Sequence, residues 1–130
     1  MEEPGGAEEP LYYNTIYTID SSGEITGAAD KVHLVPFGEY VPLESILRKI
    51  GISEVVELPG GFSAASVRRS LEVISGFSVL PLICYEAIFP GEMFYQGAAA
   101  NAIVNVTNDA WYGDTPGPYQ HFRQAQLRAV

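Results

Sequence analysis

The chain has 130 residues, 47% of them hydrophobic, which is the size and composition of one small folded domain. Its 7 basic and 16 acidic residues give a formal net charge of −9. Because the basic residues are scattered, nucleic-acid binding and electrostatic docking to anionic lipid are excluded. The single cysteine excludes a disulfide framework and a cysteine-rich zinc site. His33 and His121 have no neighbour at metal-ligand spacing, and we expect His121 to be structural.

The first half of the chain predicts a tail, a hairpin, a turn and a helix. Residues 1–10 combine Pro, Gly and Glu without apolar periodicity, which is typical of a flexible tail or loop. Residues 11–20 are rich in Tyr, Ile and Thr and favour a strand, and a second strand begins at 24–26 after a Ser-Ser-Gly turn. Residues 31–42 predict a short extended segment that ends in a turn. Apolar residues at helical offsets predict a helix over 43–50.

The second half predicts strands alternating with helices. Two apolar runs, 71–74 and 77–84, flank a Ser-Gly turn and predict a second hairpin, and the second run is apolar enough to be buried on both faces. A helix is expected over 90–100 and another buried strand over 102–107. After a polar and aromatic loop, residues 119–130 predict a final helix. The fold class is therefore mixed α/β with a central sheet.

Cys84 is the first candidate for chemistry. It follows an apolar strand and precedes Tyr85, Glu86 and the helix expected from Pro90. A strand-to-helix turn lifts a side chain out of the sheet, and the amides that follow favour a thiolate and hold an oxyanion. A lone cysteine between apolar residues is also typical of a small buried hydrophobe. Position alone leaves both interpretations open.

Charged and polar residues elsewhere are candidates to complete a site. Lys31 and Glu39 lie eight residues apart; an ammonium stabilises a developing oxyanion, and a carboxylate orients or deprotonates a partner. On a strand, Glu86 would share a face with the cysteine. Asn108 and Trp111 follow the end of a strand, where open α/β sheets place ligands, so we expect them to bind substrate or support the site. The ordinary alternatives are that the three charged residues are solvated at the surface and that the two loop residues only pack within their loop.

Three segments together resemble the carbon–nitrogen hydrolase (nitrilase) superfamily. They are residues 31–42 (KVHLVPFGEYVP), 82–86 (LICYE) and 108–113 (NDAWYG), and the closing GPYQHFRQAQLRA also fits. The first segment is the specific one and is similar to the membrane branch of the superfamily, the apolipoprotein N-acyltransferases. Other nitrilases share the lysine and the Cys-Tyr-Glu-like elbow without the whole string. The likeness runs from about residue 12 to the end of the chain.

The resemblance implies a partial α-β-β-α sandwich with a Glu–Lys–Cys triad. It implies that Cys84 attacks the acyl ester of a phospholipid, and that the resulting thioester passes its acyl chain to the α-amino group of a lipoprotein's diacylglyceryl-cysteine. Lys31 would stabilise the tetrahedral intermediate, Glu39 would be an additional carboxylate, and Tyr85 and Glu86 would stand beside the nucleophile. A thiol suits these two steps because it attacks well as thiolate and forms an activated thioester. No metal or cofactor is implied.

The resemblance also implies that residues 11–130 are the middle of a longer hydrolase domain. The general-base glutamate belongs to a strand upstream and is not assigned to any acidic residue of 1–10. Membrane-spanning helices would precede this segment and closing strands would follow it. We therefore expect the full-length protein in the bacterial inner membrane with its catalytic domain on the periplasmic side, this segment itself soluble, and the isolated chain inactive without its base.

Two other functions stay open at this point. One is a soluble amidase or nitrilase of the same superfamily, which would act on a small amide with water as the second acceptor. The other is a non-catalytic remnant or interaction module in which Cys84 is merely buried.

Overall fold

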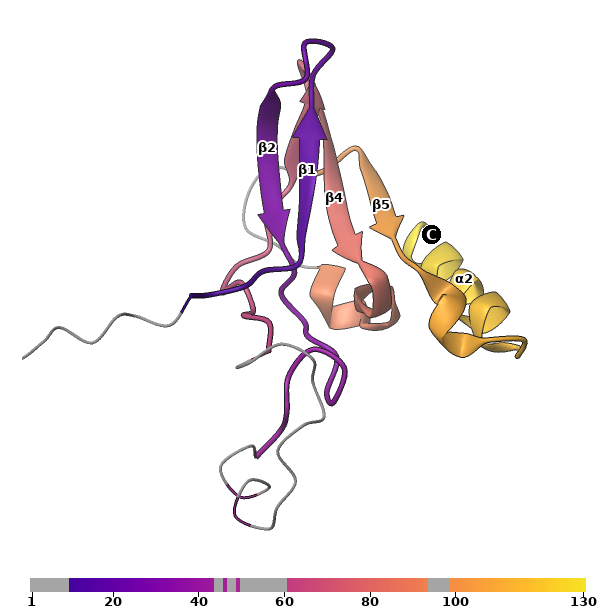
Figure 1. The fold of residues 1–130 in the computed structure, drawn as a ribbon. Coiled ribbons are helices and arrows are strands. Elements are labelled where there is room, and N and C mark those ends of the chain that lie inside the picture. Colours follow the sequence, from indigo (N-terminus) through magenta and orange to yellow (C-terminus); the bar gives the residue numbers. More distant parts are fainter. Residues whose placement is uncertain (1–9, 44–45, 47–48, 50–60, 94–98) are drawn as a thin grey trace, which may run out of the picture.

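The computed structural model describes residues 10–43, 46, 49, 61–93 and 99–130, in which the strands lie mainly in the first part and the helices mainly in the second. In chain order the elements are β1 (Thr15–Ile19), β2 (Ile25–Asp30), β3 (Leu71–Ile74), β4 (Phe77–Ile83), the 3-10 helices η1 (Cys84–Ile88) and η2 (Pro90–Met93), β5 (Ala102–Val106), the 3-10 helix η3 (Asp109–Tyr112) and α2 (Gly117–Arg128). This order confirms the predicted mixed α/β class, and Figure 1 shows the arrangement. Most of the helix expected over 43–50, and residues 1–9 of the expected tail, lie outside the described residues.

The described strands form two sheets. β1 pairs antiparallel with β2 in one sheet, and β4 pairs antiparallel with β3 and parallel with β5 in the other. Both predicted hairpins are therefore confirmed. The turn of the second hairpin contains Gly76 at φ +76°, a left-handed conformation that glycine adopts without strain.

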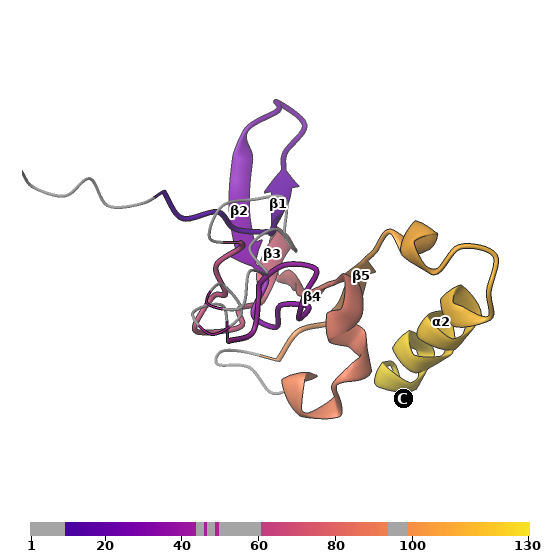
Figure 2. The ribbon, with the colours of Figure 1, turned by 60° about the horizontal axis from the view of Figure 1, so that its bottom comes forward.

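The first hairpin and α2 lie on either side of β4 and β5 (Figure 2). The hairpin contacts β3 and β4, and at Gly27 the missing side chain leaves room for Leu71, since a Cβ there would lie 3.3 Å from the Leu71 Cδ2 atom. Most of the buried apolar residues belong to β4, which confirms that this strand is covered on both faces. They are Leu71, Val79, Leu80, Leu82, Ile83 and Ala87.

The prediction that β5 is a second fully buried strand is wrong. Val104 and Val106 are 40% and 51% exposed. Side chains alternate along a strand, so only one face of β5, with Ile103 and Asn105, is turned toward α2. Nothing in the described part of the chain covers the other face to the same extent.

The segment 31–36 is bent rather than extended, which corrects another prediction. Three of its backbone N–H groups donate to carboxylates: those of Val32 and His33 to Glu86, and that of Val35 to Glu39. The N–H of Lys31 donates to the backbone carbonyl of Asn14. The turn expected after it is present.

Two helix boundaries also differ from expectation. The helix expected over 90–100 is described only as the 3-10 turn Pro90–Met93, and residues 94–98 of it lie outside the described residues. The final helix begins at Gly117, two residues before the predicted start, because Pro118 suits a first helical turn.

Candidate active site

Cys84 stands at a sharp elbow where β4 ends and η1 begins. Its φ of +53° is left-handed, a conformation that costs a residue with a side chain about 1–2 kcal/mol. The thiol is half-buried. The expected turn at the end of the strand is thus confirmed, but the first helical turn begins at Cys84 itself and not near Pro90. The strained backbone needs partners to hold it.

The Glu86 carboxylate ties this elbow to the segment that follows Lys31. One oxygen, Oε1, accepts hydrogen bonds from the N–H groups of Val32 and His33, both at 2.9 Å, and Oε2 accepts from the N–H of Ile83 at 2.7 Å. Because Glu86 lies in a 3-10 helix, it turns inward and is 1% exposed instead of sharing a strand face with the cysteine. One carboxylate therefore fixes the residue before Cys84 and the two residues after Lys31.

Arg68 balances the charge of this carboxylate. Its Nη1 and Nη2 atoms donate to Oε2 and Oε1 of Glu86 at 3.1 and 2.8 Å. Burial alone would raise the pKa of Glu86, but the hydrogen bonds from Arg68, Ile83 and His33 and the charge of Arg68 outweigh it and hold this pKa below its usual value of 4.5. Glu86 is therefore ionised at neutral pH.

Glu86→Gln is expected to destabilise the full-length protein by about 3 kcal/mol or more, because Arg68 loses its buried counter-charge and an amide N–H2 group meets N–H donors. The folded-state pKa lies below the unfolded one, so the carboxylate stabilises the fold above about pH 4.5, and this is lost as the pH falls through the folded pKa. The difference between wild type and variant should accordingly shrink in acid. Thermal unfolding in detergent over a pH series measures it.

Glu72→Gln is the matched control, since Glu72 is an exposed carboxylate that also accepts a backbone N–H, that of Gly76 at 3.0 Å. It should change stability little. The double variant Glu86→Gln with Arg68→Met should recover only part of the loss, because three backbone N–H groups still depend on the carboxylate. Full recovery would contradict the bridging role.

Lys31 and Glu39 form a partly buried ion pair beside the elbow. The Lys31 Nζ lies 2.7 Å from Glu39 Oε2, and the lysine side chain is 1% exposed. Glu39 also accepts hydrogen bonds from the Asn14 side chain at 3.0 Å and from the N–H of Val35 at 2.8 Å. An ammonium has three N–H donors, and this pair uses one of them. Glu39 thus fixes the position of a cation that is shielded from solvent.

Gly61 lets the chain approach Glu39 closely. Its φ is +69°, and a Cβ there would lie 2.6 Å from the backbone oxygen of Glu39. The next residue, Phe62, donates its N–H to that same oxygen at 2.7 Å. A side chain at position 61 would therefore push Glu39 away from where it holds Lys31.

An aromatic cluster provides a second link between the Lys31 segment and the elbow. The His33 ring packs on Phe89 with centroids 4.1 Å apart, and Tyr85 meets the same Phe89 ring edge-on at 5.4 Å. Tyr85, next to Cys84, is thereby oriented by the residue that follows η1. The predicted residues Lys31, Glu39 and Tyr85 are thus connected to the elbow by named contacts.

The loop after β5 and helix α2 reach the elbow from its other side. His121 is 2% exposed and contacts the carbonyl oxygen of Cys84, and the Tyr112 ring lies 6.2 Å from the His121 ring. The pKa of Tyr112 is raised, first by burial and then by the acidic groups of Asp109, Cys84 and Tyr85. His121 therefore links the Tyr112 ring to the backbone of the elbow.

Two predicted residues, Asn108 and Trp111, take no part in these contacts. Asn108 uses its side-chain oxygen to cap η3, accepting the N–H of Ala110 at 3.1 Å. Trp111 is 86% exposed. A role in binding substrate remains a prediction for both.

Arg68 and Asn14 carry no sequence signal that would select them, although both donate hydrogen bonds to site carboxylates. Neither belongs to a motif or lies near its partner in the sequence. Glu86 is the sequence feature that points to such partners, because a carboxylate shortly after a buried strand requires a cation or several N–H donors.

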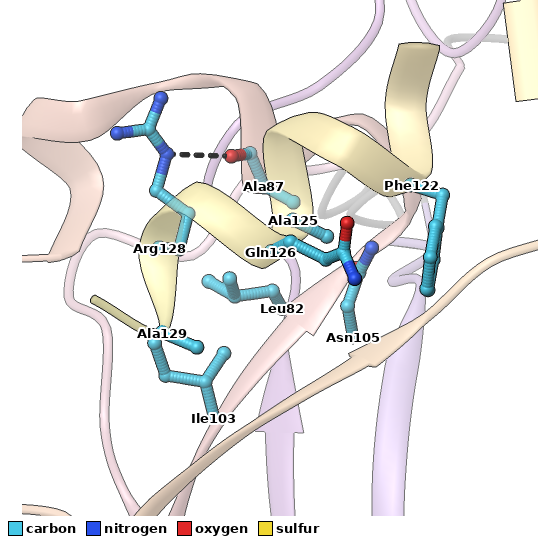
Figure 3. Close-up of a pocket in the computed structure, with 9 residues that line it drawn as sticks. All are labelled: Leu82, Ala87, Ile103, Asn105, Phe122, Ala125, Gln126, Arg128 and Ala129. Carbon is cyan, nitrogen blue, oxygen red and sulfur yellow. Dashed lines mark hydrogen bonds between the residues drawn. The ribbon is translucent and has the colours of Figure 1, made fainter. Parts of the chain in front are cut away.

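A hollow of about 240 Å³ lies next to this site, between α2 and the ends of β4 and β5 (Figure 3). Its lining is mainly apolar, with Leu82, Ile103 and Phe122, and it includes neither Cys84 nor Lys31. Arg128 closes one end of it by donating its Nε–H to the Ala87 carbonyl at 3.0 Å. The hollow is therefore separate from the thiol.

Comparison with known proteins places the chain among carbon–nitrogen hydrolases. The family model described as carbon-nitrogen hydrolase matches residues 1–130, the whole chain. The apolipoprotein N-acyltransferases of Brucella suis biovar 1 (strain 1330) and Agrobacterium fabrum (strain C58) are 68% and 66% identical to it over 132 residues, and that of Rhizobium rhizogenes (strain K84) is 62% identical over 130 residues. Each match covers 100% of this chain.

The chain spans 24–25% of the length of these curated relatives. The resemblance found in the sequence motifs, which ran from about residue 12 to the end, is confirmed, and the family match extends over residues 1–130. The chain belongs to the carbon–nitrogen hydrolase family.

Proposed function

We propose that this chain is the part of a lipoprotein N-acyltransferase that carries the nucleophile Cys84 and the oxyanion-stabilising Lys31. Relatives that bear the name apolipoprotein N-acyltransferase are 57–68% identical to it over essentially its whole length. The observation that carries the proposal is the Glu86 bridge, which holds the Lys31 segment against the elbow of Cys84.

In the first step, the thiolate of Cys84 attacks the ester carbonyl of a phospholipid. A carbon–sulfur bond forms, the ester carbon–oxygen bond breaks, and the released lysophospholipid hydroxyl takes up a proton. The thiol proton goes to a general-base carboxylate outside this chain. Lys31, positioned by Glu39, donates a hydrogen bond to the oxyanion of the tetrahedral intermediate, where a shielded cation acts more strongly than in water.

In the second step, the α-amino group of a diacylglyceryl-cysteine attacks the thioester. A carbon–nitrogen bond forms, the carbon–sulfur bond breaks, and the amine loses a proton as the thiol of Cys84 is regenerated. A thioester suits this step because it is more reactive toward an amine than the original ester.

Membrane attachment belongs to the same proposal. No helix in the described part of this chain is long and apolar enough to cross a bilayer. Because both substrates carry lipid chains, we assign membrane attachment to other segments of the full-length protein. The family resemblance implies that its catalytic domain lies on the periplasmic side of the bacterial inner membrane.

The experiment supplies the purified full-length protein with a phospholipid labelled in its acyl chain and a diacylglyceryl lipopeptide. The expected result is label on the α-amino group of the lipopeptide. In a parallel arm, the protein receives small amides and water only. Amide hydrolysis without acyl transfer would contradict the proposal and favour a soluble amidase, and the absence of both activities would favour a non-catalytic module.

Gly61→Ala is expected to slow formation of the acyl-enzyme by about 10- to 100-fold, because the new Cβ displaces Glu39 and, with it, the Lys31 ammonium. Gly76→Ala is the matched control: Gly76 also has a positive φ, +76°, but a Cβ there meets nothing within 4 Å. Single-turnover acylation rates of both variants measure the effect. Equal rates for the two variants would show that backbone strain alone, not contact with Glu39, accounts for the loss.

A further inference from the structure

His121 is a buried side chain to which the proposed mechanism gives no role. It belongs to α2 and is 2% exposed. Its Nε2 lies 3.1 Å from the carbonyl oxygen of Cys84, and its Nδ1 lies 2.8 Å from Oδ1 of Asp109. One ring therefore connects the elbow that bears the thiol with the loop that follows β5.

The chemistry of the two partners defines what the ring must do. A carbonyl oxygen only accepts hydrogen bonds, and so does an ionised carboxylate. Asp109 Oδ1 also accepts from the Thr107 hydroxyl at 2.9 Å, which fits a carboxylate acceptor. A neutral imidazole has one N–H and satisfies one of these contacts, whereas a ring that donates from both nitrogens satisfies both.

The carbonyl of Cys84 needs such donors because the elbow leaves the regular hydrogen bonding of β4. With its amide nitrogen turned toward the strand end, Asn105 donates to this carbonyl at 3.3 Å and to that of Leu82 at 3.1 Å. His121 supplies the second donor. The left-handed φ at Cys84 is a strained conformation that its surroundings must hold. Fixing the carbonyl fixes the peptide plane between Cys84 and Tyr85, and with it the direction in which the thiol leaves the backbone.

We propose that His121, held by its contact with Asp109, donates from Nε2 to the carbonyl of Cys84 and is a positioning residue that locks this carbonyl and aims the thiol at the acyl ester. This inference rests on the proposed function, since its effect is on formation of the thioester. It predicts that the hydrogen bond to the carbonyl matters more than the volume of the ring.

The test compares four variants of the full-length protein: His121→Ala, His121→Gln, His121→Asn and Asp109→Asn. A Gln amide nitrogen can reach the place of Nε2 and donate to the Cys84 carbonyl, whereas an Asn amide matches Nδ1 and reaches only Asp109. Each variant is measured for its single-turnover acylation rate at saturating phospholipid, its KM for phospholipid and its melting temperature in detergent. Asp114→Asn, an exposed change in the same loop, is the control.

His121→Ala and His121→Asn are expected to slow acylation by about 10- to 100-fold with KM unchanged, and Asp109→Asn to slow it less. His121→Gln should recover most of the rate. Equal rates for His121→Gln and His121→Asn, wild-type rates throughout, or a loss that follows melting temperature alone would overturn the inference. If the wild-type protein forms no thioester, the proposed function fails first and the inference with it; if it does, only the inference is at stake.

Discussion

Replacing Cys84 by alanine in the full-length protein is expected to abolish acyl transfer to the lipopeptide, and replacing it by serine to leave little or none. Alanine offers no nucleophile. A serine hydroxyl is a much weaker one unless its base is matched to it, and an oxygen ester is less reactive toward an amine than a thioester. The rate of lipopeptide acylation, followed by its shift on a gel, measures both variants.

The thermal unfolding of the same variants separates chemistry from folding. Alanine and cysteine meet the same backbone strain at φ +53°, and the elbow contacts of Glu86 and His121 involve backbone groups, so Cys84→Ala should unfold near the wild-type temperature. Acyl transfer by a well-folded Cys84→Ala protein would contradict the role of nucleophile.

Lys31→Ala is expected to slow acylation by about 10²–10³-fold, the effect of losing one donor to an oxyanion. Its ammonium is 1% exposed and is held 2.7 Å from Glu39, so water does not replace it readily. Single-turnover formation of the thioester at saturating phospholipid measures the loss, which should fall on the rate and leave KM for phospholipid nearly unchanged.

Two comparisons make this result specific. Lys31→Ala leaves the half-buried Glu39 without its cation, which destabilises the fold. Adding Glu39→Gln should restore stability in part and should not restore the acylation rate. Arg69→Ala is the control: it removes an exposed cation that follows Arg68 in the sequence, and it should have little effect on the acylation rate. A Lys31→Ala protein that forms the thioester at the wild-type rate would refute the assignment.

The parts of the fold that the sequence predicted are those with strong local patterns. Both hairpins followed from strand-forming residues around turn signals, and the continuous apolar run of β4 indicated burial on both faces, as observed. β5 has a similar apolar pattern, yet Val104 and Val106 are exposed. Composition cannot distinguish these strands, because burial depends on what covers each face.

The segment 31–36 shows how tertiary contacts override a local pattern. Its Val and Leu residues favour a strand, but three of its N–H groups donate to Glu86, more than fifty residues away, and to Glu39. No local signal announces such a partner. The same reason hides Arg68, which donates to the carboxylate of Glu86 and to the carbonyl of Pro81, both more than ten residues away in the sequence.

The candidate site was selected by two kinds of argument. Its position after a buried strand made Cys84 a candidate but left open whether it is a nucleophile or a small buried hydrophobe. The resemblance of residues 31–42 and 82–86 to a family then assigned roles to Lys31 and Glu39. The structure adds the contacts between these segments, above all the Glu86 carboxylate and the His121 ring. Such contacts join residues that are distant in the sequence, so they required three-dimensional coordinates.

In the proposed reaction the sulfur of Cys84 carries the acyl group, and the roles proposed for the other site residues depend on this step. Peptide mapping by mass spectrometry tests this directly: the full-length protein is incubated with a phospholipid carrying an isotope-labelled acyl chain and is quenched before and after lipopeptide is added. We predict a hydroxylamine-labile label on the peptide that contains Cys84, which disappears at the rate at which the lipopeptide gains it. An unlabelled Cys84 peptide during active transfer, or a label that stays on it after lipopeptide is added, would contradict the account.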